Sequence, residues 1–179
     1  ALAFARSDAD VTVYEQATAL KEVGAGLQIT PNGARALLDL DLGPALNASG
    51  VAAKAVVPMD AVSGDEITRF DLSRQSPPYR FLHRAALIDL LARACEAQGV
   101  RVVLDTPITQ VEKDGSFHVA GVAISPDLTI GADGVRSTVR SVLNVGEKPF
   151  FTGQVAWRAM TKAPQAEPVA RIWMAPGHH

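Results

Sequence analysis

The stretch from residue 127 to 140, DLTIGADGVRSTVR, most restricts what this chain can fold into. Apolar residues 128–130 predict a short buried strand, and apolar residues at helical spacing from Val135 to Leu143 predict a helix. Between them, Gly131-Ala132-Asp133-Gly134 predicts a tight turn around one carboxylate. A strand, a glycine-rich turn and a helix in this order favour a nucleotide-binding fold, because glycines let a backbone approach a ligand. The alternative is an ordinary turn in which Asp133 caps the helix.

The composition indicates a globular protein and excludes several classes. The chain has 179 residues, of which 47% are hydrophobic and 20% charged, so it can bury a sizeable core. A net charge of −2 gives no basic surface for nucleic acid, and no apolar run reaches the length of a membrane span. The single cysteine, Cys95, excludes an internal disulfide and a cysteine-cluster metal site. It fits a reducing compartment, and we expect a cytoplasmic protein.

The segment Val11–Glu15 predicts a strand that ends in an acid. In a dinucleotide-binding βαβ unit, an acid at the end of the second strand bonds the ribose, and a glycine fingerprint lies about 20 residues earlier. The sequence contains no G-x-G-x-x-G, so this interpretation of Glu15 places the fingerprint upstream of Ala1. We therefore expect an N-terminally truncated piece of a larger protein. The alternative is that Glu15 is a solvated acid at a strand end.

Further elements follow from local signals. Pro31 after Thr30 predicts a helix that turns Ala34, Leu37 and Leu38 inward and ends before Gly43. An apolar stripe predicts a second helix that begins after residue 83 and stops at Gly99. Strands are predicted for residues 27–29, 100–104, 108–113, 116–120, 122–124, 150–159 and 170–174, and a hairpin for residues 56–70.

Two motifs carry a resemblance to a known family. The segment from Gly131 to Ser137, GADGVRS, resembles the second flavin motif of the FAD-dependent aromatic hydroxylases, which are single-component flavoprotein monooxygenases. Leu82-His83-Arg84, followed by Leu87, also resembles this family. The resemblance runs from Val11 to Gly177 and is nearest to the salicylate and hydroxybenzoate hydroxylases.

The resemblance implies an α/β fold. It would be an incomplete, Rossmann-like FAD/NAD(P)-binding fold with an inserted or appended antiparallel sheet on the substrate side. Residues 1–148 would form an FAD-binding domain that lacks its first strand and glycine fingerprint and carries substrate-side strands near residues 55–72. Residues 149–179 would begin a substrate-binding β-sheet, and the family's later Gly-Asp motif is absent. Both ends of the family pattern are thus expected to be missing.

The resemblance also implies roles for particular residues. Asp133 and Gly134 would lie by the FAD pyrophosphate and ribityl chain, in a motif also implicated in handling NAD(P)H. Arg84 would reach toward the same pyrophosphate, the backbone at Leu104 would approach the adenine, and Gln28 would position the isoalloxazine. Two alternatives stay open here: Arg84 as a surface residue that pairs with Asp89, and Gln28 as a loop residue bonded to its own backbone. The remaining proposed cofactor contact is Glu15.

The expected activity is hydroxylation of a small aromatic substrate through a flavin hydroperoxide, with FAD as cofactor, NADH or NADPH as co-substrate and dioxygen as oxidant. No catalytic base can be named, and His83 is expected to be structural because it lacks a catalytic partner. No metal site is expected, since His178 and His179 have no third ligand. Nucleic-acid and membrane partners are not expected, and a homodimer is left open. The alternatives are a related flavin epoxidase or reductase that acts on a lipid or quinone, and a non-catalytic fragment.

Overall fold

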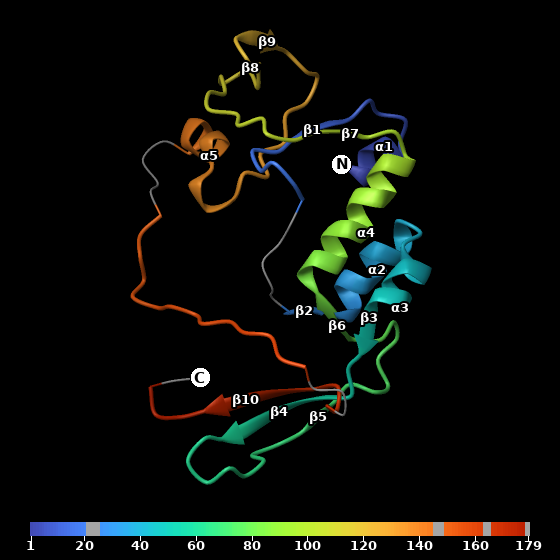
Figure 1. Cartoon of the computed structure of the whole chain (residues 1–179), viewed down its shortest axis with the longest axis vertical. Helices are drawn as coiled ribbons and strands as arrows, with labels where there is room; N and C mark the ends of the chain where they lie inside the picture. The colour runs from blue at the N-terminus through green and yellow to red at the C-terminus, as the bar shows by residue number, and fades with distance from the viewer. Residues whose placement is uncertain (21–25, 145–148, 163–165, 178–179) are drawn as a thin grey trace. The chain divides into compact units, whose positions relative to one another are not determined.

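The computed structural model describes residues 1–20, 26–144, 149–162 and 166–177, and Figure 1 shows their helices and strands. The predicted loop glycine at position 24 and the two terminal histidines lie outside these residues. The chain divides into two compact units: unit 1 holds residues 1, 3–20 and 99–157, and unit 2 holds residues 2, 21–98 and 158–179. The predicted domain boundary at residue 148 stays a prediction.

Unit 1 contains a parallel pair of strands and a hairpin. β1 (Thr12–Tyr14) runs parallel to β7 (Arg101–Val103). β8 (Phe117–Val119) and β9 (Val122–Ile124) form an antiparallel hairpin. The ring of Tyr14 meets that of Phe117 edge-on, with centroids 5.4 Å apart, and so joins the hairpin to the parallel pair. These four strands confirm the prediction, whereas the predicted strand 108–113 is reduced to a single bridge at Val111.

The helices of unit 1 are short. α1 spans Leu2–Ala5, of which residues 3–5 belong to this unit; a 3-10 turn spans Gly134–Arg136, and α5 spans Thr138–Leu143. The expected helix after the glycine-rich turn is therefore present, although it begins at Thr138 rather than Val135.

Unit 2 contains two sheets and three helices. The first sheet is antiparallel, with β6 (Arg80–His83) between β2 (Gly26–Ile29) and β3 (Gly50–Ala52). The helices are α2 (Pro31–Asp39), α3 (Gly43–Ser49) and α4 (Arg84–Ala97). One core cluster joins this sheet to the helices, and its buried members are Leu2, Ala34, Leu42, Leu46, Leu82 and Leu90.

The second sheet of unit 2 is mixed. β4 (Ala55–Asp60) lies between β5 (Phe70–Asp71), which is antiparallel to it, and β10 (Val169–Met174), which is parallel. The hairpin of β4 and β5 confirms the prediction, but the expectation of a purely antiparallel sheet is wrong. Alternate residues of β4 are buried, so one face of the strand carries a second, small core.

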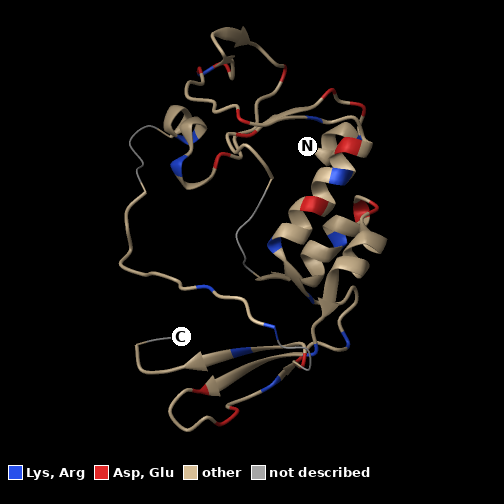
Figure 2. Cartoon of the chain, in the orientation of Figure 1, with Lys and Arg blue, Asp and Glu red and all other residues tan. Residues whose placement is uncertain are grey.

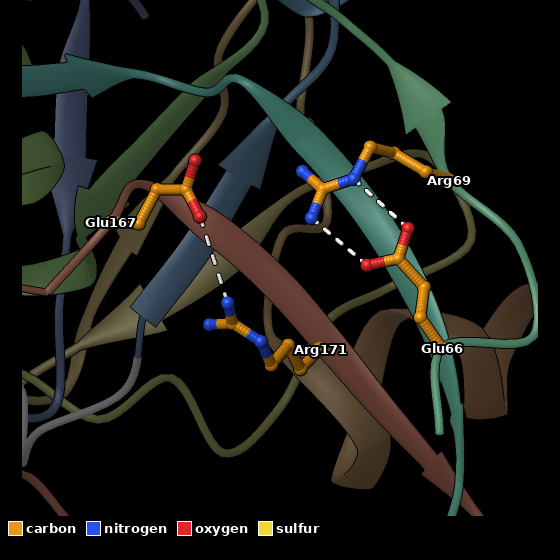
Figure 3. A network of polar contacts seen from close by, with 4 residues as sticks. All are labelled: Glu66, Arg69, Glu167 and Arg171. Carbon is orange, nitrogen blue, oxygen red and sulfur yellow. Dashed lines mark hydrogen bonds and ion pairs between the residues drawn. The ribbon is translucent and has the colours of Figure 1, made fainter. Parts of the chain in front are cut away.

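Two ion pairs lie on this second sheet, and Figure 3 shows both. Glu66 accepts hydrogen bonds from Nε and Nη2 of Arg69 at 3.0 and 2.9 Å, and Glu167 lies 3.6 Å from Nη2 of Arg171. The hydrogen bonds that Arg69 donates to Glu66 raise the pKa of Arg69 above its ordinary value. All four side chains are partly exposed, so water screens both pairs and each adds little to stability.

Local chemistry explains the boundaries of the helices. Thr30 Oγ1 accepts a hydrogen bond from the Gly33 N–H at 3.4 Å, and Pro31 occupies the first position of α2. Gly99, which follows the C-cap residue Gln98 of α4, has a φ of +75°, the usual glycine stop of a helix. The predicted inward position of Leu38 is wrong, because its side chain is 43% exposed while Ala34 is buried.

The prediction that the helix beginning at Pro31 ends before Gly43 is confirmed, since α2 stops at Asp39, and Gly43 begins the next helix, α3. The turn between α2 and α3 is made at Asp41, which has a φ of +59°. Pro44 then sits in the first turn of α3, where its missing N–H leaves no hydrogen bond unmade.

Two expected strands are not formed. Residues 128–130 and 150–159 have no strand assignment, and Leu128, Ile130, Phe150 and Trp157 are 62%, 60%, 84% and 95% exposed. A strand requires a neighbour for its backbone hydrogen bonds. Within the described part of unit 1, the parallel sheet consists of β1 and β7, and neither segment is paired to it. The apolar composition of these two segments predicted strands, but composition does not show whether a neighbouring strand is present to pair with them.

Within the described residues, no helix is both long enough and apolar enough to cross a membrane.

Candidate functional site

The turn from Gly131 to Gly134 is shaped by its two glycines. Gly134 has a φ of +72°, a backbone conformation that favours glycine over other residues. A Cβ built on Gly131 would lie 2.6 Å from the Cβ of Val139, which real side chains do not tolerate. The glycines therefore let the turn approach the following helix closely.

Asp133 and Ser137 together cap that helix, with Ser137 as its N-cap residue. Asp133 Oδ1 accepts a 2.5 Å hydrogen bond from Ser137 Oγ, and its Oδ2 accepts hydrogen bonds from the N–H groups of Thr138 and Val139 at 2.6 and 3.2 Å. Ser137 Oγ in turn accepts from the Arg140 N–H at 2.9 Å. The carboxylate thus satisfies N–H groups that the first turn of α5 leaves without helical partners. This is the capping role that the sequence left open as the alternative, and a cofactor contact by Asp133 stays a prediction.

The environment keeps Asp133 ionised. Partial burial by itself raises the pKa of this carboxyl group. The hydrogen bonds from Ser137 and from the N–H groups at the start of α5 outweigh burial and lower the pKa below its ordinary value. The negative charge also lies at a helix N-terminus, where the backbone dipoles favour it.

Asp133→Ala is expected to lower the free energy of unfolding by about 1–2 kcal/mol, because it removes the acceptor of these hydrogen bonds. Urea denaturation followed by circular dichroism measures the change. Asp133→Asn is the matched control: it keeps one acceptor oxygen and should recover part of the loss. An unchanged denaturation midpoint for Asp133→Ala would show that the cap adds no stability.

The carboxyl ends of β1 and β7 bring Glu15 and Leu104 together. The Glu15 N–H donates to the Val103 carbonyl at 2.9 Å, and the Thr106 N–H donates to the Glu15 carbonyl at 2.9 Å. Glu15 Oε1 accepts from the Ala17 N–H at 2.8 Å, which fixes the carboxylate beside its own strand end. The carboxyl edge of a parallel sheet is where nucleotide ligands bind in α/β folds. The structure therefore places two predicted site residues at one suitable edge.

The solvent-facing side of the first sheet in unit 2 forms a second candidate surface. Gln28 on β2 and Val51 on β3 both lie opposite Phe81 on β6, so their side chains share one face. The Tyr79 hydroxyl donates a hydrogen bond to Gln28 Oε1, and the Tyr79 and Phe81 rings meet edge-on with centroids 6.1 Å apart. Gln28 is therefore a strand residue bonded to a distant side chain, and its interpretation as a loop residue bonded to its own backbone is wrong.

His83 and Arg84 lie where β6 runs into α4. His83 Nδ1 accepts from the Ala85 N–H at 3.3 Å and so caps the helix, which agrees with its expected structural role. His83 Nε2 lies 3.0 Å from the sulfur of Met160. Arg84 is the exposed first residue of α4, a helix along which basic and acidic residues alternate in Figure 2.

The structure thus groups the predicted residues in three places. Glu15 and Leu104 lie at the strand edge of unit 1, Asp133 and Gly134 lie in its glycine-rich turn, and Gln28 and Arg84 lie on adjoining elements of unit 2. Sequence reasoning missed the partner of Gln28. The signal was the alternation of Tyr79, Phe81 and His83, which places these three side chains on one face.

No metal centre is seen in the described part of the chain, where no three His, Cys, Asp or Glu side chains gather closely enough to hold an ion.

The chain has relatives of known activity, although no protein-family model matches it. It is 33% identical to 3-amino-4-hydroxybenzoate 2-monooxygenase of Streptomyces cremeus, over 95% of this chain and 46% of that protein. It is 30% identical to 3-hydroxybenzoate 6-hydroxylase of Klebsiella oxytoca, over 100% of this chain and 49% of that protein. The chain therefore spans about half the length of these relatives.

Solved structures agree on the fold. The tetrameric form of 2-methyl-3-hydroxypyridine-5-carboxylic acid oxygenase matches with a TM-score of 0.73 and 24% identity, over 80% of this chain and 38% of that one. The mixed α/β arrangement of this chain is thus one that this oxygenase shares. The homologues of this chain are FAD-dependent aromatic hydroxylases, to which it is related over nearly all of its own length and about half of theirs.

Proposed function

We propose that this chain is part of a monooxygenase that hydroxylates a small aromatic substrate with FAD, NADH or NADPH, and dioxygen. The observation that carries this proposal is its relation to aromatic hydroxylases over 95% and 100% of its length. The carboxyl edge of β1 and β7 supports it, because a carboxylate stands there beside a parallel strand end. The single cysteine supports a reducing location such as the cytoplasm.

Groups in each of the two units, taken separately, suit parts of an FAD molecule. The Glu15 carboxylate is an acceptor for ribose hydroxyls, and the chain at Leu104 offers apolar surface and backbone to an adenine. The Arg84 guanidinium suits a pyrophosphate, since its fork of donors matches phosphate oxygens. When bound, FAD would supply the redox and oxygen chemistry of the reaction. The residues of this chain would bind and orient it, and none is assigned as an acid or base.

The first test is a titration of the purified chain with FAD, followed by absorbance and flavin fluorescence. We expect a bound-flavin spectrum with resolved shoulders and saturable binding. Glu15→Gln should weaken binding because it makes the acceptor neutral, whereas Asp10→Asn, at an exposed acid before the same strand, should not. A spectrum of free FAD at every concentration would count against a cofactor site in this chain.

The second part of the test measures turnover with FAD bound. We expect NADH or NADPH oxidation that is stimulated by hydroxybenzoate-type substrates and yields a hydroxylated ring. Oxidation without a hydroxylated aromatic product would favour the epoxidase or reductase alternative, and flavin binding without any oxidation would favour a non-catalytic role.

A further inference from the structure

We propose that Tyr79 is a positioning residue that orients the side-chain amide of Gln28, so that the Gln28 NH2 group donates a hydrogen bond to an acceptor atom of a bound flavin ring. This inference rests on the proposed function, because it takes FAD as the ligand. Tyr79 belongs to none of the sequence motifs described above, and the end of the Gln28 amide that would contact the flavin is its NH2 group.

The register of the sheet fixes where Gln28 points. Gln28 is paired with Phe81 across β2 and β6, while their neighbours Leu27 and Leu82 are paired with each other. Leu82 is buried in the main core of unit 2, so Leu27 and Leu82 take the inner face. Gln28 and Phe81 therefore take the outer face, where Gln28 is classed as exposed. The amide is available to a ligand on this face.

Tyr79 is itself held in place before it meets Gln28. Its carbonyl accepts a hydrogen bond from the N–H of Ala53 at 2.8 Å, and Ala53 is buried. Its ring packs edge-on against Phe81, and Pro77 and Pro78 restrict the backbone just before it. The backbone and the ring of Tyr79 are thus both held by other residues, and its hydroxyl reaches Gln28, which lies 51 residues away along the chain.

The hydrogen bond between them decides which end of the amide is free. A glutamine amide has an acceptor oxygen at one end and two N–H donors at the other. The Tyr79 hydroxyl donates to the oxygen, so that end is engaged. In the part of the chain that the structure describes, no protein acceptor is recorded for Gln28 Nε2. The end presented to a ligand is therefore a donor, and it selects an acceptor such as a carbonyl oxygen or ring nitrogen of the isoalloxazine.

The same face has room for a flat ring. Gly26 lies two residues before Gln28 on the same side of β2, and a Cβ built on it would meet nothing within 4 Å. Val51, across Phe81 from Gln28, is 59% exposed. An oriented donor, two partly covered aromatic rings and an open strand suit a planar, acceptor-rich ligand better than a charged one.

The experiment compares Tyr79→Phe, Gln28→Leu and the double variant by titration of the full chain with FAD. Tyr79→Phe keeps the ring and loses only the hydroxyl, so we expect the FAD dissociation constant to rise roughly three- to tenfold. If Tyr79 acts through Gln28, Tyr79→Phe should add nothing in the Gln28→Leu background. Tyr14→Phe removes the other tyrosine hydroxyl, from unit 1, and should leave binding unchanged.

A second readout follows the Gln28 NH2 resonance by 15N NMR, assigned by its loss in Gln28→Leu. On addition of FAD it should move downfield in the wild-type chain and less in Tyr79→Phe. Normal FAD binding by Tyr79→Phe, additive effects in the double variant, or binding without movement of this resonance would each overturn the role of Tyr79 and leave the proposed function standing. Absence of FAD binding by the wild-type chain would overturn both.

Discussion

Leu82→Ala is expected to lower the free energy of unfolding by about 2–5 kcal/mol, the usual range for truncation of a buried leucine. Leu82 lies at the centre of β6, between β2 and β3, and is 3% exposed. Its side chain belongs to the cluster that joins this sheet to α2, α3 and α4. Removing three carbon atoms leaves a cavity where four elements meet, and the surrounding backbone is tied by two ladders of hydrogen bonds that resist collapse.

Urea denaturation of the two proteins, followed by far-ultraviolet circular dichroism, measures this change. Val51→Ala is the matched control, because Val51 is one strand away on the outer face and 59% exposed. It should cost less than about 1 kcal/mol. Equal losses for Leu82→Ala and Val51→Ala would mean that the sheet is not held to the helices by its inner face.

Arg84→Ala is expected to raise the FAD dissociation constant roughly ten- to 150-fold, which corresponds to about 1.5–3 kcal/mol for a hydrogen bond to a charged group. Arg84 is the first residue of α4 and is exposed. A guanidinium at this position adds a full positive charge to the partial positive charge of the helix N-terminus, and both favour a phosphate anion. The proposed pyrophosphate contact therefore predicts a large loss when the side chain is truncated.

Two further variants separate binding from general charge effects. Arg93 is an exposed arginine on the same helix and pairs with Asp89 at 2.8 Å. Arg93→Ala should change the FAD dissociation constant less than about twofold. Arg84→Lys keeps the charge but loses the planar fork, so an intermediate constant is expected. If FAD titrations of Arg84→Ala and the wild-type chain coincide, Arg84 is a surface residue without a cofactor role.

The elements that the sequence predicted well are those with a local cause. Gly99 marks the end of α4, Pro31 and Thr30 mark the start of α2, and the β-branched residues of β1 mark a strand. Each of these signals acts within a few residues, so the local sequence is enough to predict where the helix or strand begins or ends. The capping role of Asp133 was open from sequence for the same reason, since the groups that donate hydrogen bonds to its carboxylate lie within six residues.

The features that the sequence did not predict depend on distant partners. Residues 128–130 have the composition of a strand, yet they pair with no strand among the described residues. The parallel direction of β10 against β4 depends on the path of the chain between them. The hydrogen bond of Gln28 joins residues that are 51 positions apart. The periodicity of a strand indicates which face of the sheet a side chain lies on. It does not indicate which side chain of another strand will lie next to it.

The pairing of β4 with β10 has a consequence for how the protein is made. Residue 55 of β4 pairs with residue 169 of β10. More than one hundred residues must therefore be synthesised after β4 before the hydrogen bonds between the two strands can form. At ordinary rates of synthesis this interval is roughly 5–20 s. During it, β4 has only the short strand β5 beside it, although Val57 is completely buried in the finished sheet. The apolar face of the nascent hairpin therefore stays uncovered until β10 has been synthesised.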